Sequence, residues 1–308
     1  MYLFFIGNPT AGAGKAKKSW MELEVKLLEL GWRFDIRWSA SQAQISTLVK
    51  DALLHHPDMI VSLGGDGTAH EVIKAMYAAQ LQETGPLFTV FPKGTGNDWA
   101  RYWRIPHKIH EWIEMVKMKK TYVQDLGQVA YMDETGLKKS EVFNNVAGMA
   151  YDAYVADYIE SKKKKTGVGR LQYLWFIFRC LFGYKLQQSK LSWSGGSAQD
   201  FFYTINVGIC PYSGGGLSLV PHAVHDDGLL AVTAVRPLTK WQVLLFSRHF
   251  YSGQIHQHRK VLAFNTDELL LEPCDPHDII KLETEGEYLG HLPARFTVLK
   301  NALKLCAP

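Results

Sequence analysis

The residues best suited to chemistry lie in three glycine-rich loops: residues 7–15 (GNPTAGAGK), 64–68 (GGDGT) and 93–98 (KGTGND). Glycine has no Cβ, so a glycine-rich backbone can turn tightly and approach a ligand closely. A helical pattern follows the second loop, and the free N–H groups at a helix N-terminus favour phosphate. The three loops therefore predict a site for the phosphate groups of a nucleotide.

Asp66 lies inside the second loop. A carboxylate is repelled by a neighbouring phosphate unless a cation lies between them, so Asp66 predicts Mg²⁺ or a general base that acts on a substrate hydroxyl. The alternative is a tight turn with a solvated aspartate. The other two loops add polar and charged groups at Asn8, Thr10, Lys15, Thr95, Asn97 and Asp98.

Two common nucleotide motifs are absent from these loops. The first loop is similar to a P-loop, but Ala13 stands where that motif requires lysine, and no Ser or Thr follows Lys15. None of the three loops fits GxGxxG, which disfavours a Rossmann dinucleotide site.

The elements that must position these loops alternate between strand and helix. Short apolar runs predict strands at residues 2–6, 34–38, 59–63 and 87–91. Apolar residues at helical spacing predict helices at 16–30, at 45–53 and after a capping box at 68–71. This order predicts a parallel sheet covered by helices on both faces, with the three loops at the carboxyl ends of its strands.

The pattern changes after about residue 120. Strand-like runs separated by turn residues predict an antiparallel β-sandwich with strands at 123–130, 141–147, 190–193, 201–209, 229–235, 261–271 and 279–283. A helical insert is expected at 169–184. We therefore expect an α/β nucleotide-binding lobe at 1–121 and a β-rich lobe at 122–294, and leave open whether residues 295–308 return to the first lobe.

Composition excludes several classes of protein. The 308 residues carry a formal charge of +4, too little to predict nucleic-acid binding. The four cysteines form no CxxC pair, which disfavours zinc and disulfides and favours a reducing compartment. Residues 1–9 do not read as a signal peptide, and Arg179 interrupts the longest apolar stretch, so we expect a cytoplasmic protein with no spanning helix.

The three loops, in this order and at these intervals, resemble the catalytic domain of the diacylglycerol kinase family, which includes bacterial soluble lipid kinases and sphingosine kinases. Residues 143–153 (FNNVAGMAYDA), 221–232 (PHAVHDDGLLAV) and 285–290 (EGEYLG) extend the resemblance over nearly the whole chain. It implies a nucleotide-binding lobe of the NAD kinase and phosphofructokinase type, a β-sandwich lobe, and ATP with Mg²⁺ in the cleft between them. The implied activity is transfer of the γ-phosphate of ATP to a lipid hydroxyl.

The resemblance also implies site residues. Those near the nucleotide would be Asn8, Pro9, Thr10, Ala11, Gly12, Lys15, Ser39, Gly64, Gly65, Asp66, Gly67, Thr68, Ala69, His70 and Thr95. Asp66, Asp98 and Asp125 would lie near Mg²⁺ and the reacting phosphate, and Glu287 would be the proton acceptor, with Asp66 as the competitor for that role.

Two further assignments follow from the same resemblance. The carbonyls of Val224 and Leu229 and the carboxylate of Asp227 match a second, structural magnesium site. Lys165, like Lys15, matches a basic residue near the phosphates.

The resemblance implies that Glu285 is also a catalytic residue, but the chain departs from the family at this position, where the family usually has aspartate. The extra methylene moves the carboxylate by roughly a bond length, and misplacement on the order of 1 Å can lower a rate ~10²-fold. Three alternatives to a fully active lipid kinase stay open: weak activity, a soluble acceptor as in NAD kinases, and a nucleotide-binding regulator without turnover.

A basic and aromatic region predicts contact with an anionic membrane. Residues 162–165 are four lysines, and the segment 171–186 that follows contains Trp175, Phe176, Phe178 and Phe182. The alternative is a solvated charged face beside ordinary core residues. The sequence does not identify the lipid, and it leaves the oligomeric state open, a homo-oligomer included.

Overall fold

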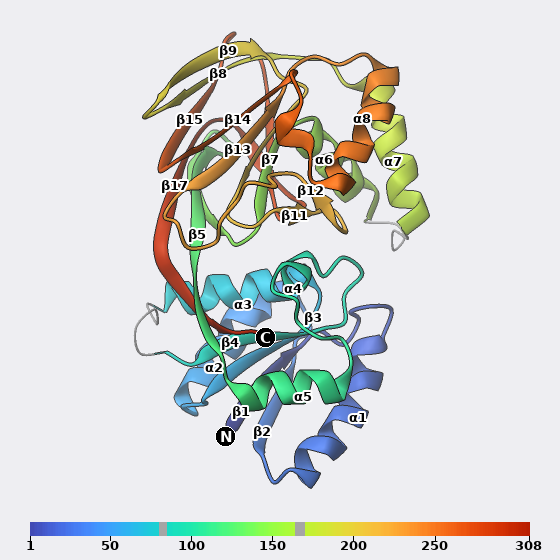
Figure 1. Ribbon diagram of the computed structural model, residues 1–308, viewed down its shortest axis with the longest axis vertical. Helices are drawn as coiled ribbons and strands as arrows, with labels where there is room; N and C mark the ends of the chain where they lie inside the picture. Colours follow the sequence, from blue (N-terminus) through green and yellow to red (C-terminus); the bar gives the residue numbers. More distant parts are fainter. Residues whose placement is uncertain (80–84, 164–169) are drawn as a thin grey trace. The chain divides into compact units, whose positions relative to one another are not determined.

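The computed structural model describes residues 1–79, 85–163 and 170–308, which form two compact units (Figure 1). Unit 1 contains Met1–Leu126 and Lys300–Pro308, and unit 2 contains Gly127–Leu299. The sequence predicts a boundary after residue 121 and leaves open a return of residues 295–308; the units change over at residue 126, and residues 300–308 belong to unit 1. The long strands β5 (Thr121–Met132) and β17 (Glu287–Cys306) carry the chain between the units.

Unit 1 is built on a parallel sheet in the order β17-β4-β3-β1-β2. Its N-terminal strands are β1 (Tyr2–Gly7), β2 (Arg33–Trp38), β3 (Met59–Gly64) and β4 (Leu87–Pro92). Every residue of β1 and β3 is buried, as central strands covered on both faces should be. Because these strands are parallel, their carboxyl ends share one edge of the sheet.

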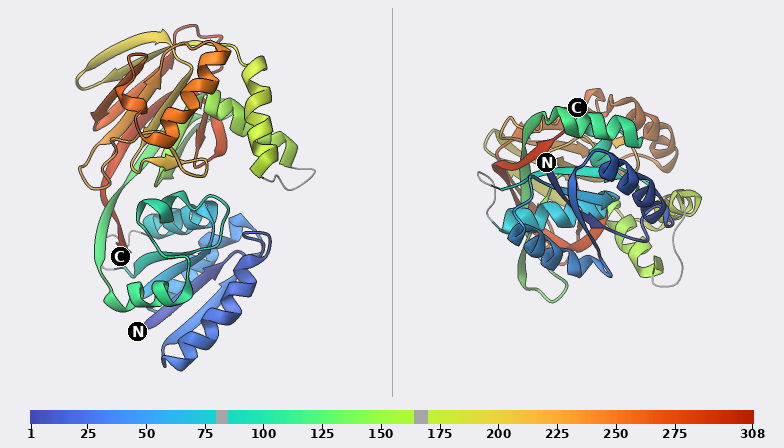
Figure 2. Two further views of the ribbon diagram at one scale, coloured as in Figure 1. Left: turned by 45° about the vertical axis from the view of Figure 1, so that its right-hand side comes forward. Right: turned by 90° about the horizontal axis from the view of Figure 1, so that it is seen from below.

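Helices cover both faces of this sheet (Figures 1 and 2). They are α1 (Lys15–Glu29), α2 (Ile45–Leu54), α3 (Asp66–Ala78), the short α4 (Asp98–Tyr102) and α5 (Ile109–Met118), with a 3-10 turn η1 (Gln42–Gln44) before α2. α1 and α5 share one face, and α2 packs against α3 on the other.

Two neighbouring phenylalanines of β1 show how the helices are assigned to the two faces. The Phe5 ring lies 4.9 Å from the Trp20 ring of α1 and 6.1 Å from the Trp112 ring of α5, centroid to centroid. The Phe4 ring stacks on His55, at the end of α2, with 5.8 Å between centroids. Successive strand residues point to opposite faces, so this pair anchors one helical layer on each side.

Unit 2 is an antiparallel β-sandwich. One run of strands is β14-β13-β10-β7-β16-β17, and the other is β9-β8-β15-β17-β5-β6, so β17 belongs to both. The strands not yet given are β6 (Lys138–Phe143), β7 (Val146–Ala150), β8 (Gln188–Trp193), β9 (Gly196–Phe201), β10 (Thr204–Gly208), β13 (Leu230–Val235), β14 (Val261–Thr266), β15 (Glu268–Pro273) and β16 (Lys281–Thr284). A small separate hairpin consists of β11 (Tyr212–Ser213) and β12 (Leu217–Ser218).

Three helices accompany the sandwich: α6 (Tyr151–Lys163), α7 (Arg170–Gly183) and α8 (Lys240–Ser252), which a 3-10 turn η2 (Ile255–Gln257) follows. Tyr151 and Ile159 of α6 pack in one buried cluster with Phe176 and Leu181 of α7. Within the described residues, no helix combines the length and apolarity needed to cross a lipid bilayer.

The parallel sheet and the antiparallel sandwich confirm the predicted fold class, but several predicted elements differ. The single strand expected at 141–147 is two strands, β6 and β7, interrupted at Asn144 and Asn145. The strand expected at 261–271 is also divided, into β14 and β15. The expected insert contains α7, while α6 and α8 were not predicted.

Candidate functional site

In unit 1 the three glycine-rich loops begin at neighbouring strand ends, which backbone hydrogen bonds tie together. The Asn8 amide donates to the Leu63 carbonyl at 3.0 Å, and the Lys93 amide donates to the Gly64 carbonyl at 2.7 Å. The Ser39 amide donates to the Gly7 carbonyl at 2.8 Å, and its hydroxyl donates to the same oxygen at 3.2 Å. Ser39 is buried in this position, where it fixes the start of the first loop.

The third loop lies against both of the others. A Cβ on Gly12 would lie 2.2 Å from the Lys93 carbonyl oxygen, and a Cβ on Gly94 would lie 2.3 Å from the Gly65 Cα. Real Cβ atoms do not come so close to backbone, so only glycine permits these approaches. The structure thus brings together the three loops that the sequence singled out.

Asp66 and Asp98 flank one backbone position of the third loop. A Cβ on Gly96 would lie 2.9 Å from Asp66 Oδ2 and 3.4 Å from Asp98 Oδ2. The Trp99 amide donates to Asp66 Oδ1 at 3.3 Å, and the Arg101 Nε lies 3.7 Å from Asp98 Oδ1. Two carboxylates at this spacing beside phosphate-type loops are oxygen ligands of the kind that Mg²⁺ prefers, so the residues present fit that ion.

Two helices direct their N-termini to these loops. α1 begins after Gly14, which has φ 85°, and α3 begins after Gly65; neither helix has a side-chain cap. Uncapped N–H groups at a helix start are ready donors for phosphate oxygens. The predicted capping box at 68–71 is wrong, because α3 begins at Asp66 and Thr68 already lies in its first turn.

The remaining predicted nucleotide residues occupy varied environments. Asn8 Oδ1 accepts hydrogen bonds from the Thr10 amide at 3.0 Å and from the Thr10 hydroxyl at 2.8 Å. Lys15 is exposed at the start of α1, and Thr95 is exposed in the third loop. Ala69 and His70 are buried inside α3, so their side chains do not face solvent. Pro9 and Ala11 lie half-buried in the first loop, and Gly67 lies half-buried in the first turn of α3.

Asn97, one of the polar groups that the sequence places in the third loop, supports that loop by hydrogen bonds, and so does Lys93, which was not predicted to have a role in the site. Asn97 has φ 53°, and its side chain exchanges hydrogen bonds with Gly94 at 2.9 and 2.8 Å. Burial lowers the pKa of Lys93, whose Nζ donates to the His107 carbonyl at 2.9 Å. The signal for Asn97 was its residue type, since asparagine tolerates the left-handed conformation.

Asp125 lies on β5 and is buried. Its Oδ1 accepts a hydrogen bond from the Asn301 amide at 2.7 Å, in the last part of β17. This bond ties the two connecting strands together inside unit 1. The contacts among Gly12, Gly65, Gly94 and Gly96 that join the three loops do not involve Asp125.

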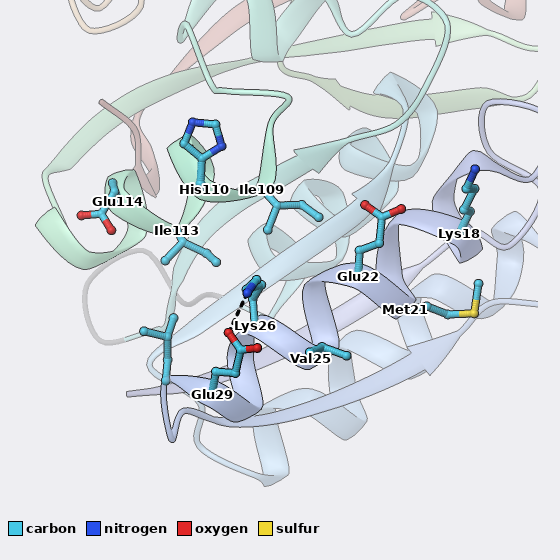
Figure 3. A pocket seen from close by; sticks show the side chains of 11 residues that line it. Lys18, Met21, Glu22, Val25, Lys26, Glu29, Ile109, His110, Ile113 and Glu114 are labelled. Carbon is cyan, nitrogen blue, oxygen red and sulfur yellow. Dashed lines mark hydrogen bonds and ion pairs between the residues drawn. The ribbon is translucent and has the colours of Figure 1, made fainter.

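A separate cavity of about 790 Å³ lies between α1 and α5 (Figure 3). Apolar side chains line it at Met21, Val25, Ile109 and Ile113, together with charged groups such as the Lys26–Glu29 ion pair. None of its lining residues belongs to the three loops. The cavity is therefore distinct from the candidate phosphate site.

In unit 2, Glu285 and Gly286 form the turn between β16 and β17, with φ 53° and 82°. The Glu285 carboxylate accepts hydrogen bonds from the backbone amides of Asn144 at 2.9 Å and Asn145 at 2.6 Å, and from Asn145 Nδ2 at 3.1 Å. These bonds occupy the chain where β6 ends and β7 has not begun, which explains why the predicted strand 141–147 is interrupted. Glu285 is thus a brace for residues 143–145 (FNN), meaning that its hydrogen bonds hold this segment in place.

Glu287 is exposed at the first position of β17, two residues beyond this brace. Behind the turn, Glu283 is buried and accepts a hydrogen bond from the Gly286 amide at 2.6 Å. Burial, with the charges of Asp152 and Glu285, raises the pKa of Glu283 well above its usual range. Burial also raises the pKa of Asp152, to which the Thr204 hydroxyl donates at 2.5 Å.

This pair of acidic residues, of which Glu283 is buried and Asp152 half-buried, was not recognised in the sequence. Asp152 and Glu283 are 131 positions apart and meet at Gly148, where a Cβ would lie 2.4 Å from Glu283 Oε1 and 3.1 Å from the Asp152 Cβ. No local pattern joins α6 to β16, so only the fold reveals the pair.

The expected second magnesium site lies in the loop before β13. Asp227 Oδ1 accepts a hydrogen bond from the Leu229 amide at 2.9 Å, and Gly228 has φ 73°, which makes a tight turn. Val224 is 45% exposed. Within residues 1–79, 85–163 and 170–308, no three His, Cys, Asp or Glu side chains gather as a metal site; a site made mostly of carbonyls would not require them.

Part of the predicted basic and aromatic region lies outside the described residues. Lys164 and Lys165 fall there, and the position of the Phe178 side chain is likewise not described. Phe176 is buried, at 5% exposure, so the expectation that it enters a membrane is wrong. Trp175 and Phe182 are exposed.

Comparison with known proteins assigns both parts of the chain. The model of the diacylglycerol kinase catalytic domain matches residues 2–129. The model of the YegS C-terminal NAD kinase beta sandwich-like domain matches residues 145–307. Together the two models leave few residues unmatched.

Curated relatives can be aligned with nearly the whole chain. Diacylglycerol kinase of Staphylococcus haemolyticus is 24% identical over 98% of this chain and 87% of its own length. The Staphylococcus carnosus protein of the same name is 25% identical over 98% and 94%. Among solved structures, a diacylglycerol kinase from Bacillus anthracis has a TM-score of 0.72 at 18% identity, covering 100% of this chain and 97% of that one. A yeast NADH kinase has a TM-score of 0.55 at 10% identity over 100% and 83%. These structures share the fold.

Proposed function

The chain belongs to the diacylglycerol kinase catalytic-domain family, and on that premise we propose that it is an ATP- and Mg²⁺-dependent lipid kinase. The membership supports a kinase, that is, a phosphotransferase. The proposal adds that the acceptor is the hydroxyl of a diacylglycerol or a similar lipid. The observation that carries it is the convergence of three glycine-rich loops in unit 1.

We assign the triphosphate to these loops. The uncapped N-termini of α1 and α3 and the loop amides donate to phosphate oxygens, and Lys15 adds a positive charge. Asp66 and Asp98 would hold Mg²⁺, which offsets charge on the phosphates when it is bound. Ser39, assigned as a nucleotide contact, and Asn97 also position the loops by their hydrogen bonds.

Glu287 is the proposed general base. Its carboxylate takes the proton of the lipid hydroxyl as that oxygen forms its bond to the γ-phosphorus, and the bond from the γ-phosphorus to the oxygen that bridges it to the β-phosphorus breaks to leave ADP. Asp66 is the competing candidate for this role. Asp125 and the loop of Val224, Asp227 and Leu229 would support the site, the latter as a structural magnesium site.

The glutamate at position 285 does not argue against turnover. Its carboxylate is used in three hydrogen bonds to Asn144 and Asn145, so its longer side chain serves a structural contact. We therefore favour a catalytic protein over a nucleotide-binding regulator, and a lipid acceptor reached from the cytoplasmic side of an anionic membrane.

A labelling assay tests the proposal. Labelled ATP and Mg²⁺ are incubated with a panel of diacylglycerol, a sphingosine-like base, phosphatidylglycerol and a polyprenol, and in parallel with NAD. We expect label in a lipid fraction with wild type, loss of that label with Asp66→Asn, and no change with Asp267→Asn, an exposed control between β14 and β15. Label in NAD alone would favour a soluble acceptor, and no label in either would favour a regulator.

A further inference from the structure

Unit 2 exposes large aromatic side chains on two neighbouring helices. Trp175 and Phe182 of α7 are 56% and 61% exposed, and Trp241 of α8 is 77% exposed. The start of α8 lies close to the end of α7, where Lys240 contacts Phe182, and Figure 1 draws the two helices as neighbours. Exposed aromatic side chains of this size that gather on one surface mark a site of interaction.

The α7 residues share one face of their helix. Trp175, Arg179 and Phe182 are spaced by four and then three positions, which places them in one stripe. The opposite face of α7 is held in the core through Phe176, Cys180 and Leu181, which are at most 5% exposed. The Trp175–Phe182 stripe is therefore the face of α7 that is exposed.

Cations lie near two of these three aromatic rings. The Arg179 guanidinium lies 5.8 Å from the centre of the Trp175 ring. Lys240 Nζ lies 4.7 Å from the centre of the Phe182 ring and donates to the Phe182 carbonyl at 3.4 Å. Trp241 directly follows Lys240. The two helices contain no aspartate or glutamate, while Arg170, Arg179, Lys240 and Arg248 are all positive.

A capping box defines the start of α8. Thr239 caps the helix in a capping box, in which the Gln242 amide donates to the Thr239 hydroxyl at 3.3 Å and the Thr239 amide donates to Gln242 Oε1 at 3.0 Å. Since Lys240 contacts Phe182, the start of α8, where Trp241 follows Lys240, lies at the end of α7.

We propose that Trp175, Arg179 and Phe182 of α7, with Lys240 and Trp241 of α8, form the surface that docks on an anionic lipid bilayer. We call these five residues the aromatic face. Tryptophan and phenylalanine enter the headgroup region, and the cations remain at its level beside lipid phosphates. The inference deepens the proposed function, on which it rests, by naming the membrane contact of a kinase whose acceptor is a lipid.

Charge and geometry favour a bilayer over a protein partner. Two helices whose charged residues are all basic complement a negatively charged surface, and the leaflet of an anionic membrane is such a surface. Aromatic residues flanked by cations are the composition of interfacial anchors.

Vesicle sedimentation without nucleotide tests the aromatic face. We expect wild type to sediment with vesicles of phosphatidylglycerol and phosphatidylcholine and to stay in solution with phosphatidylcholine alone. The double variant Trp241→Ala/Phe182→Ala should lower partitioning about tenfold to a hundredfold, and Lys240→Glu should lower it and weaken its dependence on salt. Leu54→Ala, at a position 78% exposed on α2, is the matched control and should leave partitioning unchanged.

A second readout separates this inference from the proposed function. Phosphorylation of a short-chain lipid in detergent micelles should survive the double variant, since the aromatic face is not placed in the catalytic machinery. Partitioning equal to wild type in the double variant overturns the aromatic face, whatever the kinase assay gives. If wild type binds vesicles and the double variant does not, but wild type phosphorylates no lipid, the proposed lipid kinase activity is overturned and the proposed membrane surface is supported.

Discussion

The two units organise their polar groups by different means. In unit 1 the loops are set by backbone: Gly12, Gly65 and Gly94 allow approaches that any Cβ would prevent. In unit 2 the corresponding groups are carboxylates, and Glu283 and Glu285 are fixed by burial and by hydrogen bonds from backbone amides. The first arrangement depends on the absence of side chains, and the second depends on side-chain length and charge.

The difference predicts different sensitivities. We call the three glycine-rich loops of unit 1 the cradle. Phosphate binding by the cradle should be lost when one methyl group is added to a glycine, and it should be insensitive to pH over the range in which the protein is folded. A carboxylate site should respond to changes of one methylene or one charge, and to pH. Each of the following experiments either sharpens this contrast or removes it.

The largest effect is expected at Glu287. Glu287→Gln removes the proposed base and should lower kcat by about 10²- to 10⁴-fold, while the KM for ATP stays near that of wild type. Steady-state kinetics with the lipid identified in the panel measures both constants. Glu272→Gln, on β15 of the same unit, is the control; a Glu287→Gln enzyme with wild-type kcat would transfer the role of base to Asp66.

Adding one methyl group in unit 1 should have the next largest effect. In Gly65→Ala the new Cβ would lie 2.9 Å from the Gly94 Cα, so two loops must separate. We expect kcat/KM for ATP to fall about 10²-fold, since misplacement on the order of 1 Å has that effect.

Gly31→Ala serves as the control for this change. Gly31 has φ 65°, but nothing lies within 4 Å of the added atom. The variant therefore has backbone strain but pushes no two loops apart. If both variants lose kcat/KM equally, the loss reflects general instability and the cradle is not supported.

A one-methylene change in unit 2 should act mainly on stability. Glu285→Asp shortens the brace and weakens bonds to Asn144 and Asn145, at a cost of about 1–3 kcal/mol to the local free energy of unfolding. Hydrogen exchange of the amides in β7 and β16 reports this free energy. Glu285→Gln keeps the length and should cost less; a more stable and more active Glu285→Asp would show that the family's usual aspartate is the better fit.

The smallest expected effect is a change in pH dependence. The pKa of Glu283 is raised in the folded protein above its ordinary value of 4.5, so the folded state holds a proton that the unfolded state has released. The contribution of Glu283 is therefore complete below that value and is lost as pH rises through the folded-state pKa, by about 1.4 kcal/mol for each unit of elevation that is titrated.

Glu283→Gln cannot titrate. The fall in stability between pH 5 and pH 8, measured by hydrogen exchange of β16, should therefore be smaller in this variant than in wild type. If stability falls equally in both proteins, the pH dependence comes from other groups, and Asp152 is the first candidate. Unit 1 amides in β3 provide the internal reference, where we expect no comparable change.

The same contrast explains what could be predicted from the sequence. The loops of unit 1 were found because glycines at strand ends form a local pattern, and the parallel sheet followed from alternating strands and helices. The strand break at Asn144 was missed because its cause, Glu285, lies 141 positions away. The pairing of Asp152 with Glu283 was missed for the same reason.

Two helices of unit 2 were missed despite local signals. Tyr151, Val155 and Ile159 repeat at helical spacing in α6, and Thr239 and Gln242 form a capping box before the apolar residues of α8. These helical signals were passed over because the residues on either side have strand patterns, which led to the prediction of a continuous β-sandwich. The capping box predicted at 68–71 failed for the opposite reason, because the helix begins two residues earlier, at the loop that meets the third loop through Gly94.

The central claim is that three glycine loops form one cradle for a triphosphate, and a calorimetric titration of MgATP into wild type and Gly94→Ala tests it most directly. The new Cβ would lie 2.3 Å from the Gly65 Cα, so we predict saturable binding to wild type and a dissociation constant at least about tenfold weaker in the variant. Equal affinity in the two proteins, or no binding of MgATP to wild type, would contradict the account.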